Sequence, residues 1–184
     1  MTTFYALYRT VRRINSACLG AASLLIVLIT ALTVWEAITR YFLRLPATWT
    51  YPATSYMLLW SIYLGVAYAL QRGAHVSVDF VVEMVPSRPR RWLLRLGHLL
   101  GLAFTLIFLQ QSWRLFLRHA IEGQRDISTL SLPLVVVSWA VPAGLGLMAI
   151  TYLFVLVDSF ARPAWEPTIQ EQELASSGSA IQLE

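Results

Sequence analysis

The chain has 184 residues, of which 57% are hydrophobic and only 13% are charged, with a formal net charge of +4. A soluble domain usually carries about 25% charged residues, so this composition excludes an ordinary soluble protein and predicts one that mostly faces lipid. The positive charge does not indicate nucleic-acid binding, because all basic residues are arginines that flank apolar stretches. Cys18 is the only cysteine, which excludes an intramolecular disulfide and a cysteine-cluster metal site.

The first predicted elements are a short lead-in and a membrane helix. Residues 1–13 place three arginines among aromatic and aliphatic residues, and this amphipathic segment is expected to lie along the membrane surface. A first membrane helix is predicted over residues 14–42, because Ile14 to Trp35 is an uncharged run longer than the apolar part of a signal peptide. Near its end, Glu36 and Arg40 are spaced to pair at i, i+4.

The second predicted helix covers residues 50–72. It lies in a run of 27 uncharged residues between Arg44 and Arg72, and a helix needs only about 20 apolar residues to cross a membrane. Thr50 is a candidate N-cap. Small residues at four-residue spacing predict a face that another helix can approach closely. This packing or subunit-interface face comprises Trp60, Ser61, Gly65 and Ala69.

Between the second and third helices, a short interfacial amphipathic helix is expected to end at Pro86, because a lone strand at a bilayer surface leaves its backbone groups unpaired. His75, Asp79 and Glu83 would line its polar face. Their spacing suits a metal, but any interfacial helix needs a polar face, and we favour that interpretation. The residues predicted at the cytoplasmic interface are Arg72, His75, Asp79, Arg88, Arg90, Arg91 and Arg95.

A third membrane helix is predicted over residues 92–120. Arg95 and Arg114 are 19 residues apart, about 28 Å along a helix, so each is expected to reach an opposite membrane surface. Gly97 and Gly101 form a G-x-x-x-G pattern, which predicts a second close-packing face.

The second half of this helix carries the few polar residues expected deep in the membrane. Gln110 and Gln111 are interpreted as interhelical hydrogen-bonding groups rather than a substrate path. Beyond them the helix is expected to leave the membrane, with Arg118 and Glu122 paired at i, i+4. Proteins that bind transported ions place carboxylates, histidines or broken helices near the midplane, and this pattern argues against such a site.

A fourth helix is predicted over residues 132–158, so the fold class is an all-α membrane protein with four transmembrane helices in a domain covering residues 14–162. Pro142 has no N–H for the carbonyl of Ser138, and it should kink the helix beside Gly144 and Gly146. The polar tail, residues 163–184, is expected to be disordered.

The arginines predict the orientation, because loops with more of them usually face the cytoplasm. The side holding the N-terminus, the second loop and the tail carries nine of the fourteen: Arg9, Arg12, Arg13, Arg72, Arg88, Arg90, Arg91, Arg95 and Arg162. Both termini are therefore expected to be cytoplasmic.

Residues from about 40 to 145 carry a series of motifs in a recognisable order. These are Arg40-Tyr41, Trp49, Tyr56, Trp60, Gly65, Gly73, His75, Asp79, Pro86, Leu130-Ser131-Leu132-Pro133, Pro142 and Gly144. With this order and spacing the chain resembles the small integral-membrane subunit, the DctQ-like family, of tripartite ATP-independent periplasmic (TRAP) transporters. The family often has two acidic residues after the tryptophan, where this chain has Tyr51 and Pro52.

The resemblance implies a non-catalytic, multi-pass subunit of the bacterial inner membrane, in contact with lipid and without cofactor or nucleic acid. Its partners would be a large TRAP membrane subunit, which it scaffolds, and a periplasmic solute-binding protein, for sodium-driven uptake of organic acids. The outer loops would then supply a docking surface, although plain solvation explains their charges equally well. The candidate docking residues are Arg44, Trp49, Tyr51, Arg118, Glu122, Arg125 and Asp126.

The alternative is a haem- or quinone-binding membrane anchor of a redox complex. His75 and His98 could both lie near the cytoplasmic side, one on each of two neighbouring segments, and bridge a haem. A histidine satisfied at the interface explains the same residues more simply. The sequence shows no nucleophile–base arrangement, phosphate loop or metal motif, so no enzyme is expected.

Overall fold

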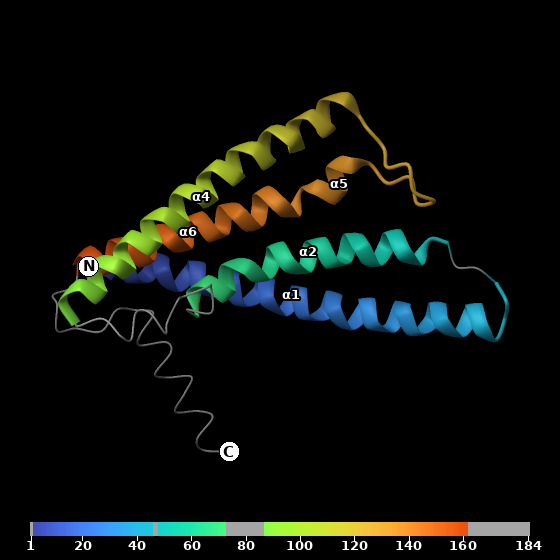
Figure 1. The fold of residues 1–184 in the computed structure, drawn as a ribbon, viewed down its shortest axis with the longest axis horizontal. Helices are drawn as coiled ribbons and strands as arrows, with labels where there is room; N and C mark the ends of the chain where they lie inside the picture. Colours follow the sequence, from blue (N-terminus) through green and yellow to red (C-terminus); the bar gives the residue numbers. More distant parts are fainter. Residues whose placement is uncertain (1, 46–47, 73–86, 162–184) are drawn as a thin grey trace, which may run out of the picture.

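A computed structural model describes residues 2–45, 48–72 and 87–161 (Figure 1). All of its regular elements in these ranges are helices. Four apolar segments are long enough to cross a membrane: Leu7–Tyr41, Thr50–Gln71, Arg95–Glu122 and Leu134–Phe160. The prediction of an all-α protein with four membrane helices is therefore confirmed.

α1 and α4 are longer than the sequence suggested, whereas α2 matches its predicted range within one residue. Their bounds are Thr2–Tyr41 for α1, Thr50–Gln71 for α2, Ser87–Glu122 for α4, Leu134–Ser138 for α5 and Ala140–Ala161 for α6. The segment expected as a separate lead-in is the continuous start of α1, and α4 begins five residues earlier than expected. The expected interfacial helix, with His75, Asp79 and Glu83, and the expected disordered tail lie outside the described residues.

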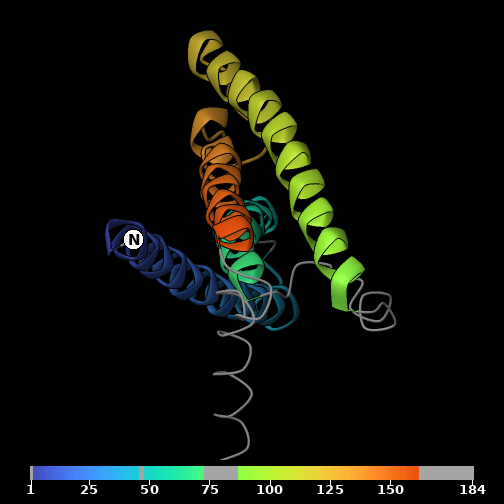
Figure 2. The ribbon, with the colours of Figure 1, turned by 90° about the vertical axis from the view of Figure 1, so that its left-hand side faces the viewer.

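The helices form an open layer in the order α1, α2, α6, α4. α1 packs along α2, α2 along α6, and α6 along α4, with slight contact between α1 and α6. Viewed from the left end of Figure 1, α1 and α4 diverge on opposite sides of α6 and α2 (Figure 2). Half of the apolar window of α6 is buried inside the structure, against 6% for α1 and 11% for α4. α6 is thus the central helix, and α1 and α4 keep broad exposed sides.

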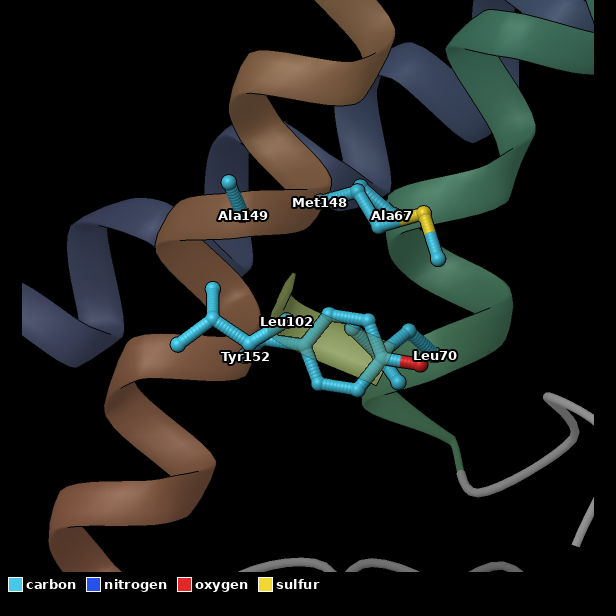
Figure 3. Packing of buried hydrophobic residues seen from close by; sticks show 6 residues of the cluster. All are labelled: Ala67, Leu70, Leu102, Met148, Ala149 and Tyr152. Carbon is cyan, nitrogen blue, oxygen red and sulfur yellow. The ribbon is translucent and has the colours of Figure 1, made fainter. Parts of the chain in front are cut away.

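The tightest approach joins α2 to α6 at Gly144. A Cβ at this position would lie 2.0 Å from the carbonyl oxygen of Tyr63, so only glycine allows the two backbones to come this close. Towards the Gln71 end of α2, a buried apolar cluster continues the contact and includes α4: Ala67, Leu70, Leu102, Met148, Ala149 and Tyr152. Figure 3 shows the ring of Tyr152 reaching from α6 towards Leu70 of α2.

The last membrane segment is interrupted between α5 and α6. α5 ends at Ser138 and α6 begins at Ala140, in the turn before buried Pro142, where the missing N–H of proline leaves the Ser138 carbonyl without its usual helical donor. The indole N–H of Trp60 donates to the carbonyl of Val137 at 3.0 Å. α2 thereby satisfies a carbonyl beside the interruption, as neighbouring helices do in membranes.

Candidate functional site

The predicted small-residue faces are used mainly inside the chain. Gly65 lies against Ala22 of α1, where an added Cβ would make ordinary contact at 3.9 Å. Ser61 is buried and its hydroxyl donates to the carbonyl of Leu58. Trp60 lies beside Trp139, with ring centroids 6.3 Å apart. Much of the predicted α2 face therefore packs against this chain's own helices.

The two glycines of the G-x-x-x-G pattern in α4 have different surroundings. An added Cβ at Gly101 would lie 2.5 Å from the hydroxyl oxygen of Tyr152, so this glycine allows α4 to approach α6. Gly97 has nothing within 4 Å of the corresponding position. The pattern does not act as one continuous packing face within the chain.

A buried polar contact that was not predicted from the sequence joins three helices. The amide nitrogen of Asn15 in α1 donates to Oε1 of Gln71 in α2 at 3.2 Å and to the hydroxyl of Thr151 in α6 at 3.1 Å. All three side chains are almost fully buried. The Oδ1 atom of Asn15 has no partner, which leaves a buried acceptor unsatisfied. The signal was present, since Asn15 is a polar residue in the first uncharged run.

Arg95 fastens α4 to the end of α6. Its guanidinium donates to the carbonyl of Ser159 at 2.6 Å and to the Ser159 hydroxyl at 3.3 Å, and it stacks over the ring of Phe160. Arg72 bonds to the hydroxyl of Tyr68. Among the other predicted cytoplasmic residues, Arg88, Arg90 and Arg91 lie in the first turns of α4, whereas His75 and Asp79 lie outside the described residues.

At the opposite end, the loop after α1 contacts the loop after α4, and the arginine counts predict that these are the outer loops. The hydroxyl of Thr129 donates to the carbonyl of Thr48 at 3.0 Å, and Tyr56 of α2 bonds to Ser128 at 3.1 Å. Both loops lie at the right of Figure 1. Backbone bonds between residues 124–126 and 132–134 close the second loop into a narrow hairpin. Of the predicted docking residues, the structure brings to this end Arg44, Trp49, Tyr51, Arg125 and Asp126, all but half-buried Asp126 being exposed.

The predicted pairing on α4 and the predicted helix cap on α2 are both wrong. Glu122 accepts a bond from Gln124 at 2.6 Å instead of pairing with Arg118, which lies four residues before the end of the helix and not in the loop. The N-cap of α2 is Trp49, and the hydroxyl of Thr50 is buried without a partner. In contrast, the predicted ion pair between Glu36 and Arg40 is confirmed.

The described residues offer little for catalysis or metal binding. They contain no group of three histidine, cysteine or acidic side chains able to hold a metal ion. His98 packs edge-on against Tyr152, with ring centroids 6.3 Å apart. The histidine proposed as its haem partner, His75, lies outside the described residues. The arrangement is one of helix contacts and loop surfaces.

Comparison with known proteins decides the family. Residues 29–162, well over half of the chain, match the model of the DctQ component of tripartite ATP-independent periplasmic transporters. The chain belongs to this family. The matched range contains α2, α4, α5 and α6 in full, together with the last part of α1 and both outer loops.

The DctQ relatives are proteins described as C4-dicarboxylate TRAP transporter small permease protein DctQ. The one from Rhodobacter capsulatus is 31% identical over 62% of this chain, and those from Pseudomonas aeruginosa and Vibrio cholerae are each 29% identical, over 60% and 46%. These alignments cover 49%, 53% and 36% of the relatives' own lengths. The chain therefore spans about half of these DctQ proteins or less.

Proposed function

We propose that this DctQ-family chain is the small membrane subunit of a TRAP-type transporter, without catalytic activity of its own. It holds the large membrane subunit in place and helps a periplasmic solute-binding protein to dock, for ion-driven uptake of organic acids. The main support for this proposal is the family match, which covers both outer loops and four of the five helices in full. The C4-dicarboxylates named for the relatives are the first solutes to test, and sodium is the proposed coupling ion.

The open layer supports a scaffolding role. A self-contained membrane bundle buries one side of each helix around a common centre, whereas here α1 and α4 diverge and only α6 is half buried. Membrane helices associate through close packing and polar contacts, and α4 keeps polar groups on its exposed side. Such an architecture suits a subunit that widens the static part of a larger complex.

The contact between the outer loops supports docking at that end. Ile127 at the hairpin is fully exposed and Tyr51 is 77% exposed, so large side chains project at the same end of the protein as the exposed Arg44 and Arg125. Exposed aromatic and aliphatic anchors within a charged rim are typical of protein-binding surfaces. We propose that this end faces the periplasm, with both termini in the cytoplasm of the bacterial inner membrane.

The function can be tested by uptake in cells that lack this chain. Uptake of labelled C4-dicarboxylates should require the chain, and the Arg44→Glu, Arg125→Glu double variant should restore uptake only partly while the amount of complex stays normal. Arg9→Gln, on the exposed side of α1 at the opposite end, serves as the control and should restore uptake fully. Undiminished uptake by the double variant at normal binding-protein concentration would remove the docking role. Undiminished uptake without the chain would remove its role in this transport.

A further inference from the structure

The side of α4 that turns away from the rest of the chain carries a line of polar side chains. Two of them are adjacent and the next two follow at steps of three and four residues, which places all four on one side of the helix, and all are exposed. We call them the polar face of α4: Gln110, Gln111, Arg114 and Arg118. The inward side holds buried Leu102 and Thr105, and His119, which bonds to Ser138 of α5 at 3.2 Å.

Contacts at the Ser138 end of α5 indicate the membrane depth of α4 near His119, just beyond the Arg118 end of the polar face. Trp60 is the eleventh of the 22 residues of α2, a helix about 33 Å long that just spans the hydrocarbon core, so we place the bilayer midplane near Trp60. Its indole bonds to Val137, and the next residue, Ser138, bonds to His119. His119 is therefore close to the level of the middle of α2.

The buried apolar cluster indicates the membrane depth of α4 near Leu102, before the Gln110 end of the polar face. Leu102 packs in the same cluster as Leu70, which lies one residue before the end of α2. Gln110 follows Leu102 by eight residues and precedes His119 by nine. Both glutamines therefore lie between the middle of α2 and its Gln71 end, and Arg114 lies closer to the middle. With the midplane at this level, the glutamines and Arg114 lie at hydrocarbon depth, whereas the sequence predicts Arg114 at the membrane surface.

These groups have no partner within the described part of the chain. None of the four side chains makes a hydrogen bond or an ion pair there. No acidic residue occurs in α4 between Arg95 and Glu122, so the charge of Arg114 is not neutralised along its own helix. Polar and charged groups at this depth normally face protein or water, because lipid tails offer them no hydrogen bond.

We propose that the polar face of α4 binds a transmembrane helix of a second, larger membrane polypeptide. This helix supplies a carboxylate opposite Arg114 and amide or carbonyl groups opposite Gln110 and Gln111. A guanidinium only donates hydrogen bonds, so its complement in a dry interface is a carboxylate. The inference rests on the proposed function, in which that polypeptide is the large transport subunit, and it assigns α4 as the helix that faces it.

The test replaces the polar groups with leucine in a tagged full-length chain and measures recovery of the complex from mildly solubilised membranes. Gln110→Leu, Gln111→Leu and Arg114→Leu together make α4 more compatible with lipid, so the subunit alone should stay folded. Recovery of the large polypeptide should fall at least about tenfold, as expected when buried polar pairs lose one side. The matched control is Thr30→Leu with Thr33→Leu on α1, whose exposed hydroxyls bond only to their own helix backbone; it should not change recovery.

A photoreactive residue at Ile107 identifies what covers this face. Ile107 is exposed and lies on the same side, one turn from the glutamines. Cross-linking to the large polypeptide supports the proposal, whereas cross-linking only to lipid, or unchanged recovery of the triple-leucine variant, overturns it. If the wild-type chain recovers no larger membrane polypeptide, the proposed function itself fails. If it does and the triple variant recovers as much, only the assignment of α4 fails.

Discussion

The α2–α6 interface and the outer side of α4 show two opposite solutions for helices in a membrane. At the first, Gly144 lets two backbones meet, and the buried polar groups of Gln71 and Thr151 both accept hydrogen bonds from Asn15 of α1. On the second, the polar groups are exposed and unpartnered within the described residues. The contrast teaches that polar groups between packed helices of this chain find partners, whereas those on the outer side of α4 find none within the described residues, as our proposal of a covering helix requires.

Forcing α2 and α6 apart should have the largest effect on the stability of the protein. Gly144→Ala places a methyl group 2.0 Å from the carbonyl oxygen of Tyr63, so the two backbones must shift apart and the free energy of unfolding should fall by about 2 kcal/mol or more. Thermal unfolding in detergent measures the loss. Gly146→Ala, two residues away with nothing within 4 Å, should unfold like the wild type. Equal stability of both variants would contradict the close approach.

Removing the buried polar contact should have the next largest effect. Asn15→Leu keeps the approximate volume but loses both hydrogen bonds to the other helices, and the expected cost is about 1–2 kcal/mol. The comparison variant is Ser16→Leu, the exposed neighbour of Asn15. Thermal unfolding in detergent applies again, and a more stable Asn15→Leu variant would mean that the unsatisfied Oδ1 atom outweighs the two bonds.

Trp60→Phe should destabilise α5 locally, beside the interruption of the last membrane segment. The aromatic body remains while the donor to the Val137 carbonyl is lost, which should cost about 0.5–1.5 kcal/mol. Hydrogen exchange of α5 should accelerate more than that of α1. Trp113→Phe, on an exposed part of α4, provides the baseline. Exchange of α5 that does not change would show that the indole bond is dispensable.

Losing the contact between the outer loops should have the smallest effect on stability among these changes. Thr129→Val removes an exposed bond to the Thr48 carbonyl, so the stability of the helices should change by less than about 1 kcal/mol. Limited proteolysis of the second loop should nevertheless become faster. Leu130→Val, which leaves that hydroxyl in place, is the control. Cleavage at the wild-type rate in Thr129→Val would indicate that the backbone hairpin alone holds the loop.

The helices could be predicted from the sequence because they depend on local features of the chain. Runs of uncharged residues longer than the membrane core predicted four helices, and the missing N–H of Pro142 predicted the interruption near Ser138. The pair between Glu36 and Arg40 depended only on helical spacing. These features need no knowledge of how the helices pack.

The contacts between helices could not be predicted from the sequence. The spacing of residues defines one face of a helix, but it does not say which neighbour covers that face. Gly97 and Gly101 share a pattern, yet only Gly101 meets another side chain within 4 Å. The level of Arg114 relative to the other helices did not follow from the sequence either, because it depends on contacts of Leu102 and His119 with those helices and not on the length of α4 alone. Asn15 looked like one polar residue in an apolar run until Gln71 and Thr151 lay beside it.

One measurement tests the central claim most directly. The chain, tagged at its C-terminus, is purified from gently solubilised native membranes, and the co-purifying proteins are identified and quantified. The account predicts one large, many-helix membrane protein in stoichiometric amount, recovered poorly with the triple-leucine variant of α4. Recovery of the chain alone, or with a flavin or iron–sulfur subunit, would contradict the account.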